Sequence, residues 1–366
     1  MKILLAGGGS GGPTTPLLAV AEEIKKTDTA AKFLFAGTSA GPEKLFVKQV
    51  GIDFVEIPAG KLRRYFSWQN FVSPFLIIAG IFKSLSVIQK FKPDLVFSAG
   101  GYVSVPVVFA ARLMGKKVVI HQQDVLKTLS NSILAPFADK VTVSFKSSQK
   151  DFNSGSGFNG ADSEKVIWTG NPVRLEISQC LGADKNQAKQ SLNLKTDWPV
   201  LLVLGGATGA AALNAALLAE LPDLCKTIQV VHISGRGKQI NFQHEHYHQY
   251  EIVSEMGKFY AAADIVVTRA GLSTLTELAY LEKPIIIVPM PDSHQLYNAK
   301  VFDQAKAALV LNEKDFVAGG LISVVKKLMY NADWQHELSQ NISGIMPRDA
   351  AAKIAAIIIE LCKKRN

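Results

Sequence analysis

MKILLAGGGSGGPTTPLLAVAEEIKK, residues 1–26, joins a short apolar run, a glycine-rich turn and a segment with helical spacing of apolar residues. The run Lys2–Ala6 predicts a buried strand, and Pro16–Lys26 predicts a helix. Between them, the turn Gly7–Gly12 satisfies the pattern GxGxxG, which lets backbone N–H groups approach a phosphate at a helix N-terminus. A tight turn that needs glycine only to bend explains the same pattern equally well.

The alternation of short apolar runs with helical patterns continues along the chain and predicts a parallel sheet with helices on both faces. Further strands are predicted at Lys32–Ala36, Asp94–Ser98 and Lys117–His121, with a helix at Val103–Met114. The second half restarts this order with a strand at Trp198–Leu204 that enters a second glycine turn. The chain is therefore predicted to be an α/β protein with two Rossmann-like domains.

A stretch rich in Ser, Gly, Asn and Asp, Lys146–Ser163, interrupts this alternation and predicts a surface loop. We place the domain boundary beside it, with a first domain at residues 1–164 and a second at 165–348. The strand predicted at Lys165–Thr169 then opens the second domain. The tail, residues 349–364, has apolar residues at helical spacing.

The composition suits two folded domains. The chain has 366 residues, of which 48% are hydrophobic and 19% charged, so it can fill two cores and is not disordered. A net charge of +9 favours an anionic partner: nucleic acid, a phosphorylated substrate or an acidic membrane surface. The three cysteines lie far apart and predict reduced thiols. No apolar run reaches the roughly 18 to 20 residues that span a bilayer.

An NAD site is disfavoured by the second predicted strand. Such a site needs an acidic residue at the end of that strand to hold the ribose, and KFLFAGTSAG, Lys32–Gly41, has none. The most informative segment lies later, at Ala263–Ala299, where a strand ends in a turn and a helix begins near Ser273. Glu277 in that helix could accept two ribose hydroxyls, while N–H groups at Gly271–Thr274 could hold a diphosphate.

The ordinary interpretation of this segment makes Glu277 a partner of the helix dipole, and His294 and Gln295 simple loop residues. Physical argument alone slightly favours it. The sequence nevertheless resembles the MurG family, the UDP-N-acetylglucosamine:lipid I N-acetylglucosaminyltransferases of bacterial peptidoglycan synthesis. Motifs along nearly the whole chain carry the resemblance: GGGSGGPTTPLLAVA (Gly7–Ala21), GTSAGPE (Gly37–Glu43), GKLRRYFSWQNF (Gly60–Phe71), GGYVSVP (Gly100–Pro106), LSNSILA (Leu129–Ala135), GNPVR (Gly170–Arg174) and Arg269–Ala299.

The resemblance implies the GT-B fold, in which two Rossmann-like domains with parallel sheets face each other across a cleft. It implies transfer of N-acetylglucosamine from UDP-N-acetylglucosamine to the C4 hydroxyl of lipid I by inverting direct displacement. It also implies that no cofactor and no metal is needed, and the sequence contains no DxD motif. The tail helix, residues 349–364, would pack back on the first domain.

Matching positions imply the residues of two sites. The donor-binding residues implied are Arg174, Gly206, Ala207, Val253, Gly271, Leu272, Ser273, Glu277, His294 and Gln295. The acceptor-binding residues implied in the first domain are Ser10, Gly11, Gly12, Tyr102, Ser104 and Asn131. Glu277 would bind the ribose hydroxyls, Val253 would contact the uracil through its backbone, and Arg174 would help to neutralise the diphosphate.

Departures from the family pattern concern mainly the acceptor side. Pro13 replaces the usual histidine, His121–Asp124 is HQQD where the family has HEQN, and Ala207 replaces a serine. Asp124 is therefore our candidate general base, although capping of the following helix is its more ordinary role. Two alternative functions stay open: a GT-B transferase with another lipid acceptor, and a catalytically weak UDP-sugar-binding protein.

A cationic and apolar segment predicts peripheral attachment to the cytoplasmic side of the cell membrane. Lys61, Arg63 and Arg64 precede a mostly apolar helix, which could lie on an anionic leaflet. Within the helix, Phe75, Ile78, Phe82 and Leu85 are expected to face the core, and Ile77 and Ile81 to stay exposed. The expected partners are thus UDP-N-acetylglucosamine, lipid I and an anionic membrane surface, with no nucleic acid.

Overall fold

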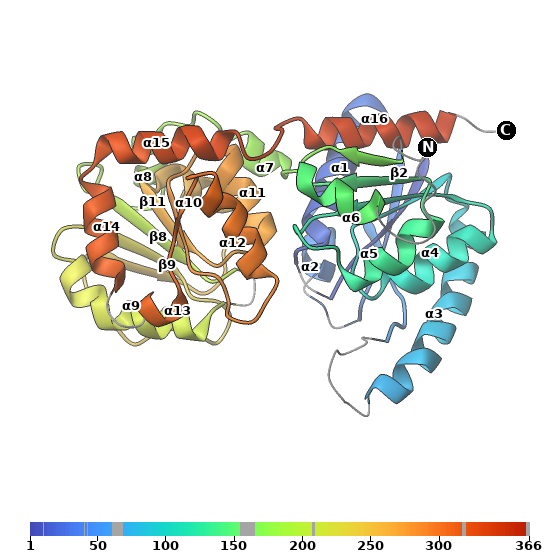
Figure 1. Ribbon diagram of the computed structural model, residues 1–366, viewed down its shortest axis with the longest axis horizontal. Helices are drawn as coiled ribbons and strands as arrows, with labels where there is room; N and C mark the ends of the chain where they lie inside the picture. The colour runs from blue at the N-terminus through green and yellow to red at the C-terminus, as the bar shows by residue number, and fades with distance from the viewer. Residues whose placement is uncertain are drawn as a thin grey trace. The chain divides into compact units, whose positions relative to one another are not determined.

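The computed structural model describes residues 1–9, 11–39, 41, 43–60, 69–153, 165–206, 209–316 and 320–363. The chain forms two compact units, Met1–Arg174 with Pro347–Asn366, and Leu175–Met346 (Figure 1). In both units the described strand pairings are all parallel, and helices connect successive strands except β9 and β10. The predicted α/β class is therefore confirmed.

The first unit contains strands β1 (Lys2–Ala6), β2 (Lys32–Gly37), β3 (Asp53–Glu56), β4 (Leu95–Ser98), β5 (Lys117–Gln122), β6 (Lys140–Val143) and β7 (Val166–Trp168). Its helices are α1 (Thr14–Thr27), α2 (Glu43–Gln49), α3 (Gln69–Phe91), α4 (Ser104–Leu113), α5 (Leu129–Leu134), α6 (Gln149–Asn153) and α16 (Ala350–Lys363), with short 3-10 turns at Ala135–Phe137 and Lys146–Ser148. The sheet order is β3-β2-β1-β4-β5-β6-β7, so β1 lies inside the sheet and has strands on both sides.

The second unit repeats this plan. Its strands are β8 (Val200–Leu204), β9 (Gln229–Ile233), β10 (Tyr247–Tyr250), β11 (Ile265–Thr268), β12 (Ile285–Ile287) and β13 (Leu309–Val310), in the order β10-β9-β8-β11-β12-β13. Its helices are α7 (Leu175–Ser178), α8 (Lys185–Ser191), α9 (Ala211–Leu224), α10 (Met256–Ala262), α11 (Leu272–Tyr280), α12 (Gln295–Gln304), α13 (Glu313–Asp315), α14 (Leu321–Met329) and α15 (Ala332–Ser343).

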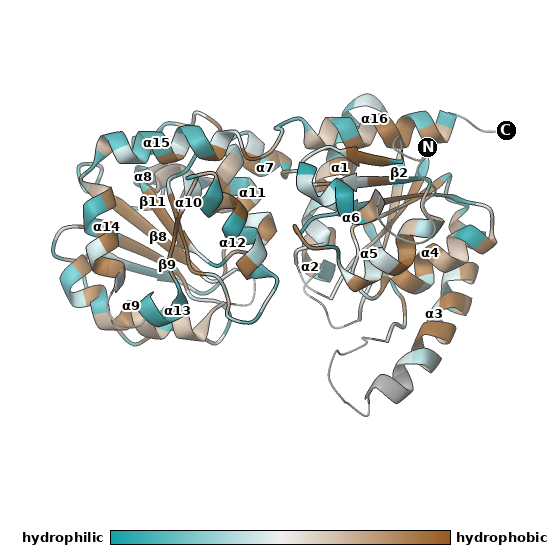
Figure 2. Cartoon of the chain, in the orientation of Figure 1, coloured by the Kyte–Doolittle hydropathy of each residue, from teal (hydrophilic) through white to brown (hydrophobic). Residues whose placement is uncertain are grey.

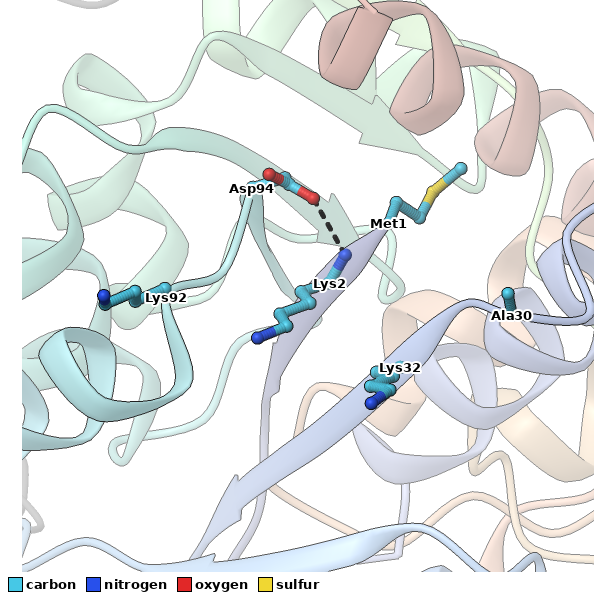
Figure 3. A pocket seen from close by; sticks show the side chains of 6 residues that line it. All are labelled: Met1, Lys2, Ala30, Lys32, Lys92 and Asp94. Carbon is cyan, nitrogen blue, oxygen red and sulfur yellow. Dashed lines mark hydrogen bonds between the residues drawn. The ribbon is translucent and has the colours of Figure 1, made fainter.

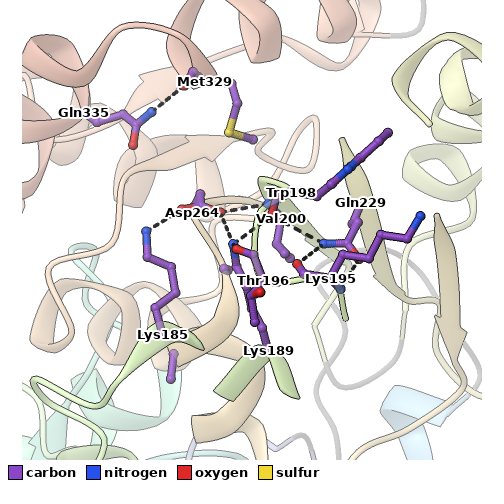
Figure 4. Close-up of polar contacts among 12 residues, drawn as sticks. Lys185, Lys189, Lys195, Thr196, Trp198, Val200, Gln229, Asp264, Met329 and Gln335 are labelled. Carbon is purple, nitrogen blue, oxygen red and sulfur yellow. Dashed lines mark hydrogen bonds and ion pairs between the residues drawn. The ribbon is translucent and has the colours of Figure 1, made fainter. Parts of the chain in front are cut away.

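Alternation along β1 shows how the first sheet is covered on both faces. Leu4 packs in a cluster with residues of α3 and α4, whereas Ile3 packs in a second cluster with α1 and α16. Successive side chains of a strand point to opposite faces, so a strand buried on both sides must be apolar throughout. In the second unit, Asp264 accepts from Val200 N–H at 2.8 Å and pairs with Lys185 at 2.5 Å, which fixes the amino ends of β8 and β11 (Figure 4).

The domain boundary predicted after residue 164 is wrong. The strand that was expected to open the second domain is β7, which pairs with β6 and extends the first sheet, with Trp168 opposite Val143. The division between the compact units falls after Arg174 instead. Residues 154–163 of the predicted surface loop lie outside the described residues. The helix predicted in the tail is α16, and it packs on α1 of the first unit.

The predicted orientation of α3 is also wrong. Of the four residues expected in the core, Phe75, Ile78 and Phe82 are 74%, 52% and 69% exposed, whereas Leu85 packs against the apolar cluster as predicted. Ile77 and Ile81, which were expected to stay exposed, are half-buried. The inward face of the helix begins with small residues, among them Gly80, where an added Cβ would lie 2.1 Å from the Pro58 carbonyl oxygen. Small side chains let the helix backbone approach its neighbours closely, so the large apolar side chains are left on the outer face. Figure 2 shows hydrophobic residues along most of α3.

By length and composition alone, Ser73–Phe91 could cross a membrane, since its mean hydropathy reaches 1.4 and 22% of it is buried. The end of this helix nevertheless belongs to the fold. Val87 and Ile88 are buried in the same apolar cluster as Leu4 of β1. The helix is therefore anchored in the first unit by its C-terminal half.

Candidate functional site

Each sheet has one place where the strand order reverses, between β1 and β4 in the first unit and between β8 and β11 in the second. In open parallel sheets, ligands bind beyond the carboxyl ends of the strands at this point, because the connections leave it in opposite directions. All four of these strands are followed by glycine-containing turns. The topology thus gives each unit one candidate binding site.

In the first unit, the turn after β1 packs directly on the turn after β4. Gly8 and Gly101 touch, since a Cβ added at Gly101 would lie 2.5 Å from the Gly8 carbonyl oxygen. Gly9 has φ +87° and lies under Tyr102, whose Cε1 would be 2.5 Å from an added Cβ. Glycine is needed here for close approach of two backbones and for a left-handed conformation. Tyr102 is half-exposed above this contact.

The buried side chain of Glu43, at the start of α2, lies beneath the same turn. One carboxylate oxygen accepts from the Gly9 N–H at 3.2 Å, the Thr38 N–H at 2.8 Å and the Thr38 hydroxyl at 2.5 Å. Because Gly9 donates to a carboxylate of the protein itself, an anionic ligand must use other N–H groups of the turn. Gly11 and Gly12, which lead into α1, remain the candidates, and Ser10 lies outside the described residues.

Two predicted acceptor residues support this site from inside. The Ser104 hydroxyl is buried, and its proton is shared between two backbone carbonyl oxygens, that of Gly100 at 2.7 Å and that of Ala6 at 3.1 Å. The Asn131 amide is buried as well, and donates to the His121 carbonyl at 3.0 Å. They join the ends of β1, β4 and β5. Their direct contact with an acceptor stays a prediction, as does that of Tyr102, Gly11 and Gly12.

The HQQD segment begins with the last two residues of β5, and its Gln122 side chain holds the loop that follows. Its amide donates to the carbonyl oxygens of Asp124 at 2.9 Å and Leu126 at 2.8 Å, and its carbonyl accepts from Thr128 N–H at 3.3 Å. A carboxylate could not donate the first two bonds. His121 is fully buried between Thr142 and Asn171, and desolvation lowers its pKa to about 4. The histidine is therefore neutral and closed off from any substrate.

Asp124 is half-buried in the loop that Gln122 organises. The ordinary role expected for it, capping the following helix, belongs to another residue. Thr128 is the N-cap of α5, and its side-chain oxygen accepts from the Asn131 N–H at 3.3 Å. Asp124 is therefore not the cap of α5, and its assignment as the general base stays a prediction.

In the second unit, the two turns of the candidate site border open space. A Cβ added at Gly206 after β8, or at Gly271 after β11, would meet no heavy atom within 4 Å. Gly271 is the N-cap of α11, so Leu272 and Ser273 belong to the first turn, where backbone N–H groups have no partner within the helix. These are suitable donors for a diphosphate. Ala207 lies outside the described residues.

Polar side chains fix the turn after β11 from behind. The Gln295 side-chain oxygen, Oε1, accepts from Ala270 N–H at 3.2 Å and Met290 N–H at 3.1 Å, while the Asn298 side-chain amide donates to the Ala270 backbone carbonyl at 3.1 Å. Arg269 donates to the Val288 carbonyl at 3.1 Å and pairs with Glu313. Sequence reasoning missed these supports, because their partners are distant in the chain. The side-chain oxygen of Gln295 therefore has a structural role, because it holds this turn.

The remaining donor positions are placed as follows. Glu277 is buried on α11 and accepts a hydrogen bond from Tyr260 on α10 at 3.0 Å. Val253 is half-buried in the loop before α10, and His294 is exposed at the N-cap of α12. Arg174 is half-buried at the end of the first unit. Among the described residues, no group of three or more His, Cys, Asp or Glu could hold a metal ion.

A hollow of about 400 Å³ lies at the opposite, amino-terminal edge of the first sheet. It is lined by Met1, Lys2, Ala30, Lys32, Lys92 and Asp94 (Figure 3). Asp94 accepts from the Lys2 N–H at 2.9 Å there. Because it is at the wrong end of the strands, this hollow is separate from the candidate site.

Comparisons with known proteins agree with this geometry. The sequence matches the glycosyltransferase family 28 N-terminal domain over residues 3–143 and the C-terminal domain of that family over residues 200–354. It is 34% identical over 364 residues to the UDP-N-acetylglucosamine--N-acetylmuramyl-(pentapeptide) pyrophosphoryl-undecaprenol N-acetylglucosamine transferase of Clostridium kluyveri, with 98% of each chain covered. A protein of the same name from Lachnospira eligens is 35% identical, again over 98% of each chain. The crystal structure of Acinetobacter baumannii MurG has a TM-score of 0.70 and 23% identity, covering 98% of this chain and 99% of that one. The predicted GT-B class is thereby confirmed.

Proposed function

The chain belongs to the MurG family within glycosyltransferase family 28, and from that membership we propose that it transfers N-acetylglucosamine from UDP-N-acetylglucosamine to lipid I in peptidoglycan synthesis. The arrangement of the site in the second unit is the observation that supports this function best. Its two turns border open space, α11 begins at one of them, and Glu277 of that helix is buried within the same unit. This combination provides donors for a diphosphate and an acceptor for ribose hydroxyls.

The donor would be held as follows. Backbone N–H groups at Gly271–Ser273 and at the turn containing Gly206 and Ala207 bind the diphosphate, helped by the positive end of α11. Glu277 accepts the ribose hydroxyls, and the backbone at Val253 contacts the uracil. Arg174, His294 and Gln295 complete the site around the diphosphate and the sugar. Charge that develops on the departing UDP is thus stabilised by amides and a guanidinium.

The reaction we propose is a single displacement. The C4 hydroxyl of the N-acetylmuramoyl residue attacks C1 of the donor sugar, the bond from C1 to the UDP oxygen breaks, and the configuration inverts. Asp124 takes the proton of the attacking hydroxyl. Gly11, Gly12 and Tyr102 at the reversal point of the first sheet would hold the acceptor diphosphate and sugar. Ser104 and Asn131 support that surface.

The acceptor is anchored in a membrane, and α3 supplies a surface for it. Phe75, Ile78 and Phe82 are exposed and lie at helical spacing on one face of α3, with Lys83 and Lys90 exposed on the same helix. Apolar side chains enter the lipid interface, and lysines are attracted to anionic headgroups. We propose peripheral binding to the cytoplasmic side of the cell membrane. Lys61, Arg63 and Arg64, which were predicted to contribute, lie outside the described residues.

Turnover of UDP-N-acetylglucosamine with a lipid I analogue tests this function. The expected result is release of UDP together with a product that carries one additional N-acetylglucosamine. Transfer only to a different lipid-linked acceptor would favour another GT-B transferase. Binding of UDP with no transfer to either acceptor would favour a catalytically weak UDP-sugar-binding protein.

A further inference from the structure

Tyr260 contacts the proposed ribose carboxylate directly, and the sequence alone gave no reason to assign it a role. Its hydroxyl donates to Oε2 of Glu277 at 3.0 Å, and the two residues are 1% and 5% exposed. They come from different helices, α10 and α11, and lie 17 positions apart in the chain. The contact is therefore tertiary and places a phenol against a carboxylate in an enclosed environment.

A ribose presents two neighbouring hydroxyls, and a carboxylate that accepts from both must hold its plane in one orientation. In water such a group rotates freely, and burial alone does not set its angle. A hydrogen bond from a fixed donor to one oxygen sets the angle, and it uses only one of the roughly four acceptor positions of a carboxylate. We propose that Tyr260 is a positioning residue, which orients Glu277 to accept the ribose hydroxyls of the donor nucleotide. This inference rests on the proposed function.

Helix α10, which carries Tyr260, is held at both of its ends. At its start, the Gly257 N–H donates to the Glu176 carboxylate at 2.7 Å. A Cβ added at Gly257 would lie 2.4 Å from the Cys180 sulfur, so the helix approaches α7 closely. At its end, Lys283 donates to the carbonyl oxygens that close the helix, with 3.0 Å to Ala263. A helix clamped in this way can hold the tyrosine hydroxyl at a fixed point.

The same helix also bears on recognition of the base. Val253 lies in the loop that leads into α10, three residues before Met256, the first residue of the helix. One rigid element thus connects the loop proposed for the uracil with the tyrosine that orients the ribose carboxylate. Loss of the Tyr260 hydroxyl should weaken the contact with the ribose and leave the base and diphosphate contacts in place.

The experiment measures binding of UDP and of 2′,3′-dideoxy-UDP by isothermal titration to the parent protein, Tyr260→Phe and Glu277→Ala. Tyr260→Phe should weaken UDP binding about tenfold, the scale of one hydrogen bond to a charged group. Its binding of dideoxy-UDP should match that of the parent, so the preference for UDP shrinks. Glu277→Ala should lose the preference altogether. In turnover, Tyr260→Phe should raise KM for the donor and leave kcat close to the parent value.

Tyr247→Phe is the matched control, since it also removes a hydroxyl from a buried tyrosine of the second unit. That hydroxyl donates to Gln249 at 3.1 Å and lies 2.8 Å from Nδ1 of His232, and Tyr247 is at the start of β10, the edge strand. Its binding of both nucleotides should equal that of the parent. The inference is overturned if Tyr260→Phe weakens the binding of UDP and of dideoxy-UDP equally, or if it changes the binding of neither. The role of Tyr260 would then be structural. If the parent itself does not prefer UDP over dideoxy-UDP, the proposed donor site fails as well.

Discussion

Replacing Phe75 and Phe82 with serine should release the protein from anionic vesicles, because these rings stand out from α3 with 74% and 69% of their surface exposed. Burying a whole phenylalanine side chain is worth about 1.5–3 kcal/mol, so each ring at this exposure supplies about 1–2 kcal/mol on entering a lipid interface. The double variant should lose about 2–4 kcal/mol, or about 30- to 700-fold in the partition coefficient. Its folding should change little, since neither ring fills the core.

Sedimentation with vesicles of anionic and of neutral lipid measures this partition coefficient. Tyr330→Ser is the matched control, because Tyr330 is 66% exposed but belongs to the second unit. Added salt should weaken the attraction of the anionic vesicles, since exposed lysines contribute about 1 kcal/mol each near a charged surface. If the double variant sediments with anionic vesicles as well as the parent does, α3 is not the membrane-binding surface.

Three further predictions concern the first unit and the pH dependence of stability. Asp124→Asn should lower turnover roughly 100-fold with UDP binding intact, the usual scale for loss of a general base, and transfer at the parent rate would remove Asp124 from that role. Glu43→Ala should cost about 3 kcal/mol in urea unfolding, because the Gly9 and Thr38 donors lose their acceptor, whereas Glu43→Gln should cost less. Burial lowers the pKa of His121 and His232 from 6.5 to about 4, so the unfolded chain takes up these protons first as the pH falls. The free energy of unfolding should therefore decrease below pH 6.5, by about 2 kcal/mol per histidine at pH 5, and thermal melts at pH 5 and 7.5 that coincide would contradict this.

Interior strands could be predicted from the sequence because both faces of each sheet are covered. Lys2–Ala6 was predicted with the bounds that the structure has, since a strand buried on both sides must be almost entirely apolar. The strand Tyr247–Tyr250 was not predicted, because YHQY at the sheet edge pairs through its backbone and keeps three side chains half-buried. Edge strands of this kind lack the apolar signal.

The orientation of α3 could not be predicted from hydrophobicity. Its pattern places large apolar residues at helical spacing, which normally marks a core face. The structure instead turns Gly80 and Ser84 inward, because they allow close packing, and leaves Phe75 and Phe82 outside. A sequence shows which residues share a helix face, but the partner that covers the face decides its burial.

The candidate site was also predictable from the sequence only in part. Its glycine turns were found because glycine and the strand before it are adjacent in the sequence. The supports for those turns were not, since Glu43 reaches Gly9 across 34 positions and Tyr260 reaches Glu277 across 17. In the sequence each looks like an ordinary helical residue. Their role appears only when tertiary packing brings them to the turn or to the ribose carboxylate.

The position of α16 has a consequence for the order in which the protein folds during synthesis. Ile354 and Ile358 share an apolar cluster with Leu17 and Ile24, yet the ribosome makes α16 only after the whole of the second unit. The nascent first unit therefore exposes an apolar surface until translation is nearly finished. This exposed surface favours chaperone binding or aggregation. For the same reason, residues 1–174 expressed alone should be poorly soluble, and fusing residues 347–366 directly behind them should restore a foldable unit.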